Sequence, residues 1–313
     1  MRKAAACAQA AAPRSTLHGL RHTATQSGMK KVLVIGLGKT GTTIVASVIQ
    51  KSIVDARLLV EPRTVALLEK LRKFNVPWIV KILYEHWIDR PFLLDGIVRG
   101  ETGFLPDTAI AIIRDPRDAL ISGLMYRAYE CVLDGASRRQ VDEWLGIVRG
   151  KEANPHEYSV IDLIGHMRRI FDVAYAPDPF FETFLKYTSW VTGNLVRLHV
   201  LKYEEFVTGR IAALSASLGI ELSDEREVDP SLQRVGRTKR SGAWQKLMLP
   251  ADVAYLRPRY GAALAKHGYD EWDVFPATLN PVEGSDYIAR ITDEAFMTRA
   301  GKAGGQPTPS PNG

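Results

Sequence analysis

The feature that most constrains the fold is a glycine-rich turn between an apolar run and a helix near the start of the chain. Residues 31–36 read KVLVIG, a continuous β-branched run that predicts a buried strand ending at glycine. GKTGTT follows and opens a helix over TTIVASVIQKS. Glycines allow close backbone approach, and the first turn of a helix presents free N–H groups. This turn therefore predicts a phosphate-binding loop.

The loop departs from two common phosphate-binding patterns. In the nucleoside-triphosphate form, GxxxxGK[ST], a lysine directly precedes the helical Ser/Thr. Counted from Gly36, Gly41 fits that form but Thr42 stands in the place of the lysine, and the lysine of this loop, Lys39, comes earlier. The dinucleotide triplet GxGxxG is met by Gly36, Gly38 and Gly41. On the triplet alone, a Rossmann-type cofactor site and a glycine turn without a ligand both stay open.

Four further apolar runs predict strands. They are RLLVE at 57–61, WIVKIL at 78–83, TAIAIIR at 108–114 and LVRLHVLKY at 195–203. Helices are expected between them: one begins at Pro62, one follows Asp115–Pro116, and residues 137–190 are mainly helical. This alternation predicts an α/β fold with three layers, a mostly parallel central sheet flanked by helices, of P-loop-like type.

The domain plan follows from composition. We interpret 1-29 as a flexible basic extension, 30-298 as one domain with a helical substrate-wall insertion at about 123-190, and 299-313 as a disordered tail. Because the extension is rich in alanine and arginine and free of acids, a transit peptide is an alternative, as is a domain that starts at Met29.

The charge distribution argues against a nucleic-acid partner. Residues 1–31 hold six basic side chains and no acid, and the rest of the chain balances 35 basic against 35 acidic residues. A nucleic-acid binder carries its excess on the folded domain. The two cysteines, Cys7 and Cys131, fit a reducing compartment. No apolar run reaches the length of a membrane span, so we expect a cytoplasmic protein without an integral membrane span; the oligomeric state is left open.

KTGTT resembles the 5′-phosphosulfate loop of the sulfotransferases that use 3′-phosphoadenosine 5′-phosphosulfate (PAPS), where KSGTT or RSGSS is usual. The resemblance implies that Lys39 reaches the bridging oxygen between phosphate and sulfate. It also implies that the 5′-phosphate is held by backbone N–H and hydroxyl groups of Thr40, Gly41, Thr42 and Thr43.

A second motif, IAIIRDPRDALISGLMY, resembles the 3′-phosphate site of the same family. An arginine, Arg114, ends a strand, and a serine, Ser122, follows eight residues later on a helix. A guanidinium suits this role because it can grip a phosphate through two parallel hydrogen bonds. The alternatives are a surface ion pair between Arg114 and Asp118 and an ordinary small helix residue at Ser122.

Two weaker matches extend the resemblance. LHVLKYEEF is similar to the family's strand that ends in Tyr-Glu-Asp, which implies that Tyr203 lies near the adenine; a core tyrosine is the alternative. RTKRSGAWQ is similar to the RKGxxGDWK segment, whose loop closes over the 3′-phosphate. Arg237, Gly242 and Trp244 match that segment, whereas Thr238, Lys239, Ala243 and Gln245 depart from it. Lys239 and Arg240 could take over the phosphate contacts electrostatically, and a solvated basic loop is the alternative.

The general base differs from that of the cytosolic members, which carry a histidine in a KTH segment. Here the segment reads Lys81-Ile82-Leu83, and His86 comes three residues later. Carbohydrate sulfotransferases have a Glu, often Glu-Pro, after the second strand, and this chain has Glu61 before Pro62. The resemblance implies Glu61 as the base. His86 could take the place of the absent histidine, although a surface histidine is the alternative, and Glu85 is a third candidate. Glu61 could also simply favour the dipole of the helix that starts at Pro62.

Together these motifs imply transfer of a sulfuryl group from PAPS to a hydroxyl of a glycan, a glycolipid or a small molecule, with PAP (3′-phosphoadenosine 5′-phosphate) as the product and no metal. A P-loop nucleotide kinase or NTPase and a non-catalytic nucleotide-binding relative are the alternatives. Five aromatic side chains are either an acceptor wall or part of the core: Phe180, Phe181, Phe184, Tyr187 and Trp190.

Overall fold

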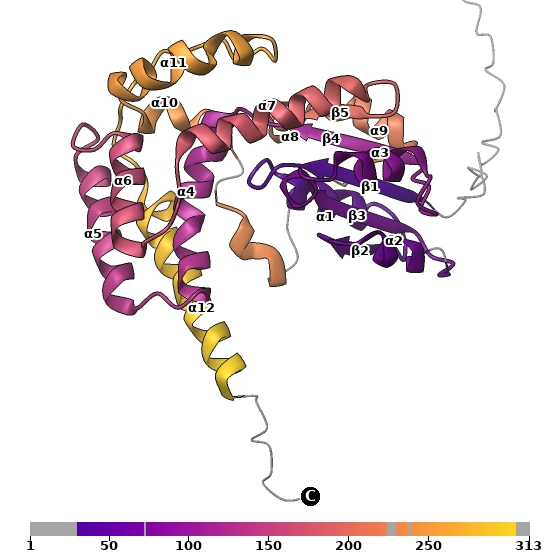
Figure 1. Ribbon diagram of the computed structural model, residues 1–313, viewed down its shortest axis with the longest axis horizontal. Coiled ribbons are helices and arrows are strands. Elements are labelled where there is room, and N and C mark those ends of the chain that lie inside the picture. Colours follow the sequence, from indigo (N-terminus) through magenta and orange to yellow (C-terminus); the bar gives the residue numbers. More distant parts are fainter. Residues whose placement is uncertain (1–29, 72, 224–229, 238–239, 305–313) are drawn as a thin grey trace, which may run out of the picture.

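A computed structural model describes residues 30–71, 73–223, 230–237 and 240–304, and Figure 1 shows their arrangement. The strands are β1 (Lys31–Gly36), β2 (Arg57–Val60), β3 (Trp78–Leu83), β4 (Thr108–Ile113) and β5 (His199–Lys202). The α-helices are α1 (Thr42–Lys51), α2 (Val65–Leu71), α3 (Pro91–Arg99), α4 (Pro116–Leu133), α5 (Arg138–Ala153), α6 (Val160–Phe171), α7 (Pro177–Gly193), α8 (Tyr203–Val207), α9 (Ala212–Leu218), α10 (Ala243–Leu247), α11 (Pro250–Ala265) and α12 (Ser285–Gly304). Short 3₁₀ helices are η1 (Tyr84–His86), η2 (Pro230–Val235) and η3 (Pro281–Glu283).

The strands form one parallel sheet in the order β2-β3-β1-β4-β5. The α/β prediction is confirmed, and every pairing is parallel where the sequence predicted a mostly parallel sheet. In such a sheet all carboxyl ends lie along one edge, where ligands bind in open α/β folds. The glycine loop follows β1 at the centre of that edge, and Arg114 follows β4 next to it.

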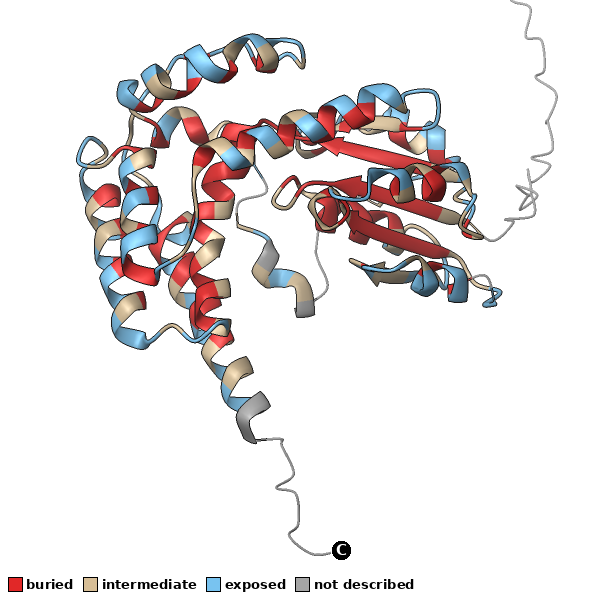
Figure 2. Ribbon diagram, in the orientation of Figure 1, coloured by how far each residue is buried: buried red, intermediate tan, exposed pale blue. Residues whose placement is uncertain are grey.

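Helices cover both faces of the sheet, as the continuous apolar strands require. Val32 and Val34 of β1 pack in one cluster with α1, α8 and α9. Leu33 and Ile35, which point to the opposite face, pack in a larger cluster with α2, α3 and α7. Figure 2 shows the central strands β1, β3 and β4 as the buried centre of this half of the molecule, whereas the edge strands β2 and β5 are less buried.

Three strands differ at their ends from the sequence prediction, and of these β4 differs only in ending at Ile113, one residue before Arg114. β5 begins at His199 and not at residue 195, because Leu195 and Val196 are exposed, and it ends before Tyr203, which starts α8. β2 ends at Val60 because Glu61 adopts a left-handed conformation with φ 53°, although its N–H still donates to the Lys81 carbonyl at 2.8 Å. The backbone therefore departs from the strand at Glu61, and the carboxylate does not point as it would in a continued strand.

The region predicted as a helical insertion, about 123-190, is helical, running from the middle of α4 through α5 and α6 to α7. Figure 1 shows α4, α5, α6 and α12 gathered beside the sheet. α12 continues to Gly304, past the domain boundary placed at residue 298. Within the described residues, no helix is both long and apolar enough to span a bilayer.

Candidate functional site

A cavity of about 630 Å³ lies at the carboxyl edge of the sheet, between the strand ends and the helices α4 and α7. Its walls come from the glycine loop, the segments after β2, β3 and β4, the start of α8 and the segment after η2. Most site residues proposed from the sequence line it: Lys39, Gly41, Thr42, Thr43, Glu61, His86, Arg114, Ser122, Tyr203 and Arg237. The fold therefore brings together residues that lie almost 200 positions apart.

The conformation of the glycine loop explains why glycine stands at positions 36 and 41. A Cβ at Gly36 would lie 2.6 Å from Thr42 Cγ2, and a Cβ at Gly41 would lie 2.3 Å from two carbons of the Tyr203 ring. Gly41 also has φ 89°, which favours glycine. Lys39 adopts the left-handed region as well, at φ 66°. The loop is therefore tightly wound, and the ring of Tyr203 packs directly against it.

The start of α1 presents polar groups to the cavity. Gly41 caps the helix without a side-chain hydrogen bond, and no acidic residue lies in the first turn. Thr42 and Thr43 are buried and line the cavity. Thr40 differs from the sequence expectation, because its N–H and hydroxyl both donate to the Leu37 carbonyl, at 3.3 and 2.7 Å, and it does not line the cavity. Of the four residues 40–43, it is therefore 41–43 that line the cavity at the start of α1.

The Lys39 side chain lies on the cavity wall among other basic side chains. Its Nζ is 3.9 Å from the centre of the Tyr126 ring. Burial, reinforced by the Arg237 guanidinium, lowers the pKa of Lys39 to about 7. Tyr126 was missed in the sequence, although it lies four residues after Ser122 and hence on the same face of α4. An anion next to Lys39 would restore its charged form.

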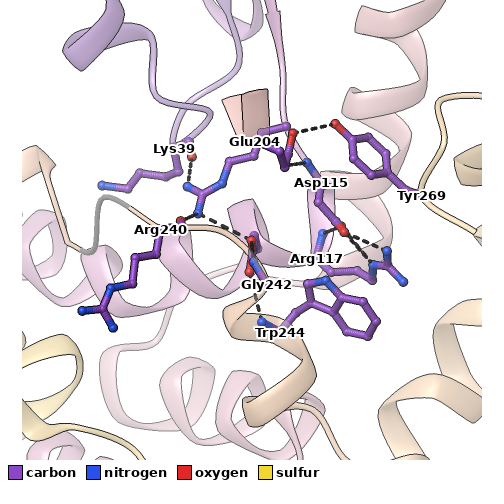
Figure 3. Close-up of polar contacts among 10 residues, drawn as sticks. Lys39, Asp115, Arg117, Glu204, Arg240, Gly242, Trp244 and Tyr269 are labelled. Atoms are coloured by element: carbon purple, nitrogen blue, oxygen red, sulfur yellow. Dashed lines mark hydrogen bonds and ion pairs between the residues drawn. The ribbon is translucent and has the colours of Figure 1, made fainter. Parts of the chain in front are cut away.

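Arg114 joins the end of β4 to the glycine loop. Its Nη1 donates to the Lys39 carbonyl at 2.8 Å and its Nη2 to the Arg240 carbonyl at 3.2 Å, and dashed lines to Lys39 and Arg240 mark both bonds in Figure 3. The guanidinium also stacks on the Tyr203 ring, 4.5 Å from its centre. An ion pair with Asp118 exists at 3.8 Å, but both side chains are buried, so it is not the surface pair considered from the sequence.

Donors without a partner point to an anion here. The Nε of Arg114 and the Nε and Nη2 of Arg237 are buried and have no hydrogen-bond partner among the described residues. Burial and the neighbouring Arg114 lower the pKa of Arg237, whose Nη1 donates to the Glu283 carbonyl at 3.0 Å. Buried polar groups are almost always satisfied, so these donors fit a phosphate that would complete their hydrogen bonds.

The remaining basic residues of that segment take other places. The Arg240 side chain is exposed, with Nη1 3.5 Å from Glu283 Oε1, and it does not line the main cavity. Its backbone carbonyl, not its charge, contacts Arg114. Lys239 lies outside the described residues.

A carboxylate and a lysine face the cavity from β2 and β3. Glu61 Oε1 is 2.5 Å from Lys81 Nζ, and the Lys81 side chain is 5% exposed against 32% for Glu61. The parallel register places Val60 beside Lys81, which brings Glu61 within reach. Lys81 was not proposed from the sequence, although a lysine within the apolar run WIVKIL signals a buried charge that needs a partner.

The two other acid–base candidates also line the cavity. Glu85 Oε1 accepts the Gly38 N–H at 2.7 Å, and burial raises the pKa of Glu85. His86 Nε2 is 3.4 Å from Arg63 Nη2, and burial together with Arg63 lowers the pKa of His86. Glu85 thus fixes the residue before Lys39, and His86 is held in its uncharged form.

The aromatic side chains of α7 divide into two groups. Phe181, Phe184, Tyr187 and Trp190 are buried in the large core cluster. Phe180 is only partly buried and lines the cavity, as Tyr175 does. Of the five proposed as wall or core, one therefore belongs to the wall. In the parts of the chain that the structure describes, no group of three or more His, Cys, Asp or Glu side chains is placed to hold a metal ion.

Comparison with known proteins gives distant structural likenesses and no likeness in sequence. No protein-family model matches the chain, and no curated protein matches its sequence. Among solved structures, the mouse sulfotransferase SULT7A1 complexed with PAP is similar at a TM-score of 0.44 and 15% identity, over 78% of this chain and 90% of that one. What the cavity binds must therefore be argued from the residues of this chain.

Proposed function

We propose that the protein is a sulfotransferase that moves a sulfuryl group from PAPS to an acceptor hydroxyl of a small molecule or carbohydrate. The observation that carries the proposal is a single cavity lined both by the glycine loop with Lys39 and by Arg114 and Arg237. PAPS carries anionic groups at both ends of one adenosine, so it matches a cavity with two separate cationic sites.

The first cationic site would hold the 5′ end of the nucleotide. The N–H groups at the start of α1 and the hydroxyls of Thr42 and Thr43 would bind the 5′-phosphate, and the Tyr203 ring would pack beside the adenine. Lys39 would face the oxygen that becomes negative as the sulfuryl group departs. A charge preorganised at such an oxygen stabilises the transition state more than the ground state.

The second cationic site would hold the 3′-phosphate. Arg114 and Arg237 offer three buried nitrogen donors that lack partners among the described residues. Ser122, also buried, adds a hydroxyl to the same wall. A nucleoside triphosphate with Mg²⁺ would suit this wall poorly, because the end of β4 offers the guanidinium of Arg114 where the metal would need a carboxylate.

We propose Glu61 as the general base. PAPS supplies an activated sulfuryl group whose bond to the 5′-phosphate oxygen breaks as a new S–O bond forms to the acceptor oxygen. Glu61 would accept the acceptor proton, and Lys81 would hold the carboxylate in place through its 2.5 Å contact. His86 and Glu85 remain further candidates, since both line the cavity.

A thermal-shift series with PAP, Mg–ATP and NAD tests the nucleotide. Selective stabilisation by PAP is expected, because a ligand that binds the native state raises its stability by mass action. Stronger stabilisation by Mg–ATP would favour a kinase or NTPase, and stronger stabilisation by NAD a Rossmann-type site. Labelled PAPS offered with hydroxyl acceptors then tests transfer, and Lys39→Ala should abolish turnover. Binding of PAP with no transfer to any acceptor would indicate a non-catalytic relative.

A further inference from the structure

One buried carboxylate connects the two segments that form the second cationic site. Asp118, in the first turn of α4, is 0% exposed. Its Oδ2 accepts the Gly242 N–H at 2.6 Å and its Oδ1 accepts the Trp244 N–H at 3.0 Å. Figure 3 shows these bonds as dashed lines at Gly242 and Trp244. The start of α10, which has no capping side chain of its own, is thus capped by an acid 124 residues earlier in the chain.

The same carboxylate faces Arg114. Asp118 Oδ2 lies 3.8 Å from Arg114 Nη2, and that nitrogen also donates to the Arg240 carbonyl. Asp118, Arg114 and the segment 240–244 therefore form one closed set of contacts, in which moving one member shifts the others. Arg237 lies three residues before Arg240, so the position of this segment also bears on its guanidinium.

Charge alone does not explain Asp118 in this place. Arg114 and Arg237 line the same cavity, and the charge of Arg114 lowers the pKa of Arg237. An anion would gain most from two guanidiniums without a carboxylate beside them, because a like charge in a buried site repels it. Asp118 thus weakens the attraction for a phosphate, while its hydrogen bonds fix the backbone that frames the site.

We propose that Asp118 is a positioning residue that orders Arg114 and the segment 240–244 for the 3′-phosphate of the nucleotide. This inference rests on the proposed function, since it assumes that the ligand carries a 3′-phosphate. Asp118 does not touch the ligand. It acts through the backbone of Gly242 and Trp244 and through the guanidinium of Arg114.

The test compares two nucleotides that differ only at the 3′ position. Dissociation constants for PAP and for adenosine 5′-phosphate are measured by isothermal titration calorimetry at one ionic strength. The constant for adenosine 5′-phosphate divided by that for PAP is the preference for PAP, and it reports the 3′-phosphate contacts. Asp118→Asn keeps the shape of the side chain, removes its charge and leaves one acceptor for two backbone N–H groups. It should weaken PAP binding about tenfold and leave adenosine 5′-phosphate within about twofold.

A matched control separates positioning from a general loss of stability. Asp252 is also 0% exposed and accepts three backbone N–H groups, from Leu249, Val160 and Ile161, at 2.8–3.0 Å. It does not line the cavity. Asp252→Asn should lower the melting temperature but leave the ratio of the two dissociation constants unchanged.

A second variant perturbs the same contact from its other side. Gly242 has φ 81°, and a Cβ there would meet nothing closer than Gln245 Oε1 at 3.5 Å. Gly242→Ala therefore strains the backbone without steric conflict and leaves the charge of Asp118 in place. Gly242→Ala should reduce the preference for PAP over adenosine 5′-phosphate about fivefold, and it tests the positioning role by itself if Asp118→Asn does not fold.

The outcomes separate the inference from the proposed function. If the wild-type protein binds PAP and adenosine 5′-phosphate equally, it has no 3′-phosphate site and the proposed function fails. If the wild type prefers PAP but both variants keep or increase that preference, Asp118 acts only as an opposing charge and the positioning role is wrong. A selective loss for PAP in both variants, with the control unchanged, supports it.

Discussion

Binding of PAP is expected to take up a proton at alkaline pH, because Lys39 lies where its charge is disfavoured. Its pKa is lowered to about 7, so roughly a tenth of the Lys39 side chains are protonated in the ligand-free protein at pH 8. A phosphate beside Nζ favours the ammonium and raises this pKa in the complex. Each bound nucleotide should therefore take up about 0.9 proton at pH 8.

The sign of the pH dependence follows directly. Because a proton is taken up on binding, affinity falls as pH rises above 7, by about tenfold between pH 8 and pH 9. Titration of the nucleotide phosphates does not add to this fall in affinity, because their second pKa is about 6 and they are dianionic above pH 7. Nearby groups do not titrate there either: burial raises the pKa of Tyr126 to about 12, and His86, with its lowered pKa, stays uncharged.

Calorimetric titration at pH 8 in buffers of different ionisation enthalpy measures the proton uptake. Lys39→Arg is the matched variant, because a guanidinium stays charged throughout this range; it should show almost no uptake and a flat affinity between pH 8 and pH 9. The reasoning is refuted if the wild type takes up less than about 0.2 proton or if Lys39→Arg takes up as much as the wild type.

In the ligand-free protein the same lowered pKa of Lys39 should make the free energy of unfolding rise with pH from about 7 to about 10, since in this range the unfolded chain binds the extra proton.

Three further variants test other parts of the site. Glu61→Gln should lower turnover by about 10²–10⁴ with PAP affinity unchanged, and normal transfer by this variant would exclude Glu61 as the base. Gly41→Ala should lower the free energy of unfolding by about 1–3 kcal/mol in urea denaturation and disrupt PAP binding, because its Cβ meets the adjacent tyrosine ring at 2.3 Å. Phe184→Ala should cost about 3–5 kcal/mol of stability as a core truncation, whereas Phe180→Ala should cost about 1 kcal/mol or less and raise the KM for the acceptor; equal stability losses would contradict the division of α7 into core and wall.

The parts of the site that the sequence predicted are those encoded over a few neighbouring residues. The turn after β1 is recognisable because an apolar run, closely spaced glycines and a helix follow one another within 20 residues. Arg114 is recognisable because Asp115 and Pro116 fix the start of α4 directly after it, and the Asp115 side chain accepts the Arg117 N–H at 2.9 Å. Local capping thus places the arginine at the strand end without knowledge of the rest of the fold.

The parts that were missed depend on pairings across the sheet or between distant segments. Glu61 and Lys81 meet only because β2 and β3 are neighbours in a particular register, which no local pattern determines. The hydroxyl of Thr40 turns inward because the loop winds back on Leu37, a detail of backbone conformation. Arg240 contributes a carbonyl and not its charge, because the capping of α10 by Asp118 fixes the path of this segment.

The balance of buried charge explains why such a cavity suits a doubly anionic ligand. Lys81 has a carboxylate partner in Glu61, and Arg114 is held by two carbonyls and one acid. Arg237 keeps two buried nitrogens without partners among the described residues, and it helps to lower the pKa of Lys39. Buried cations destabilise a fold unless an anion offsets them, and the Arg237 guanidinium lies on the wall of the cavity. A 3′-phosphate at these nitrogens would offset that charge, which is why we expect PAP to stabilise the protein more than a nucleotide that carries a phosphate at one end only.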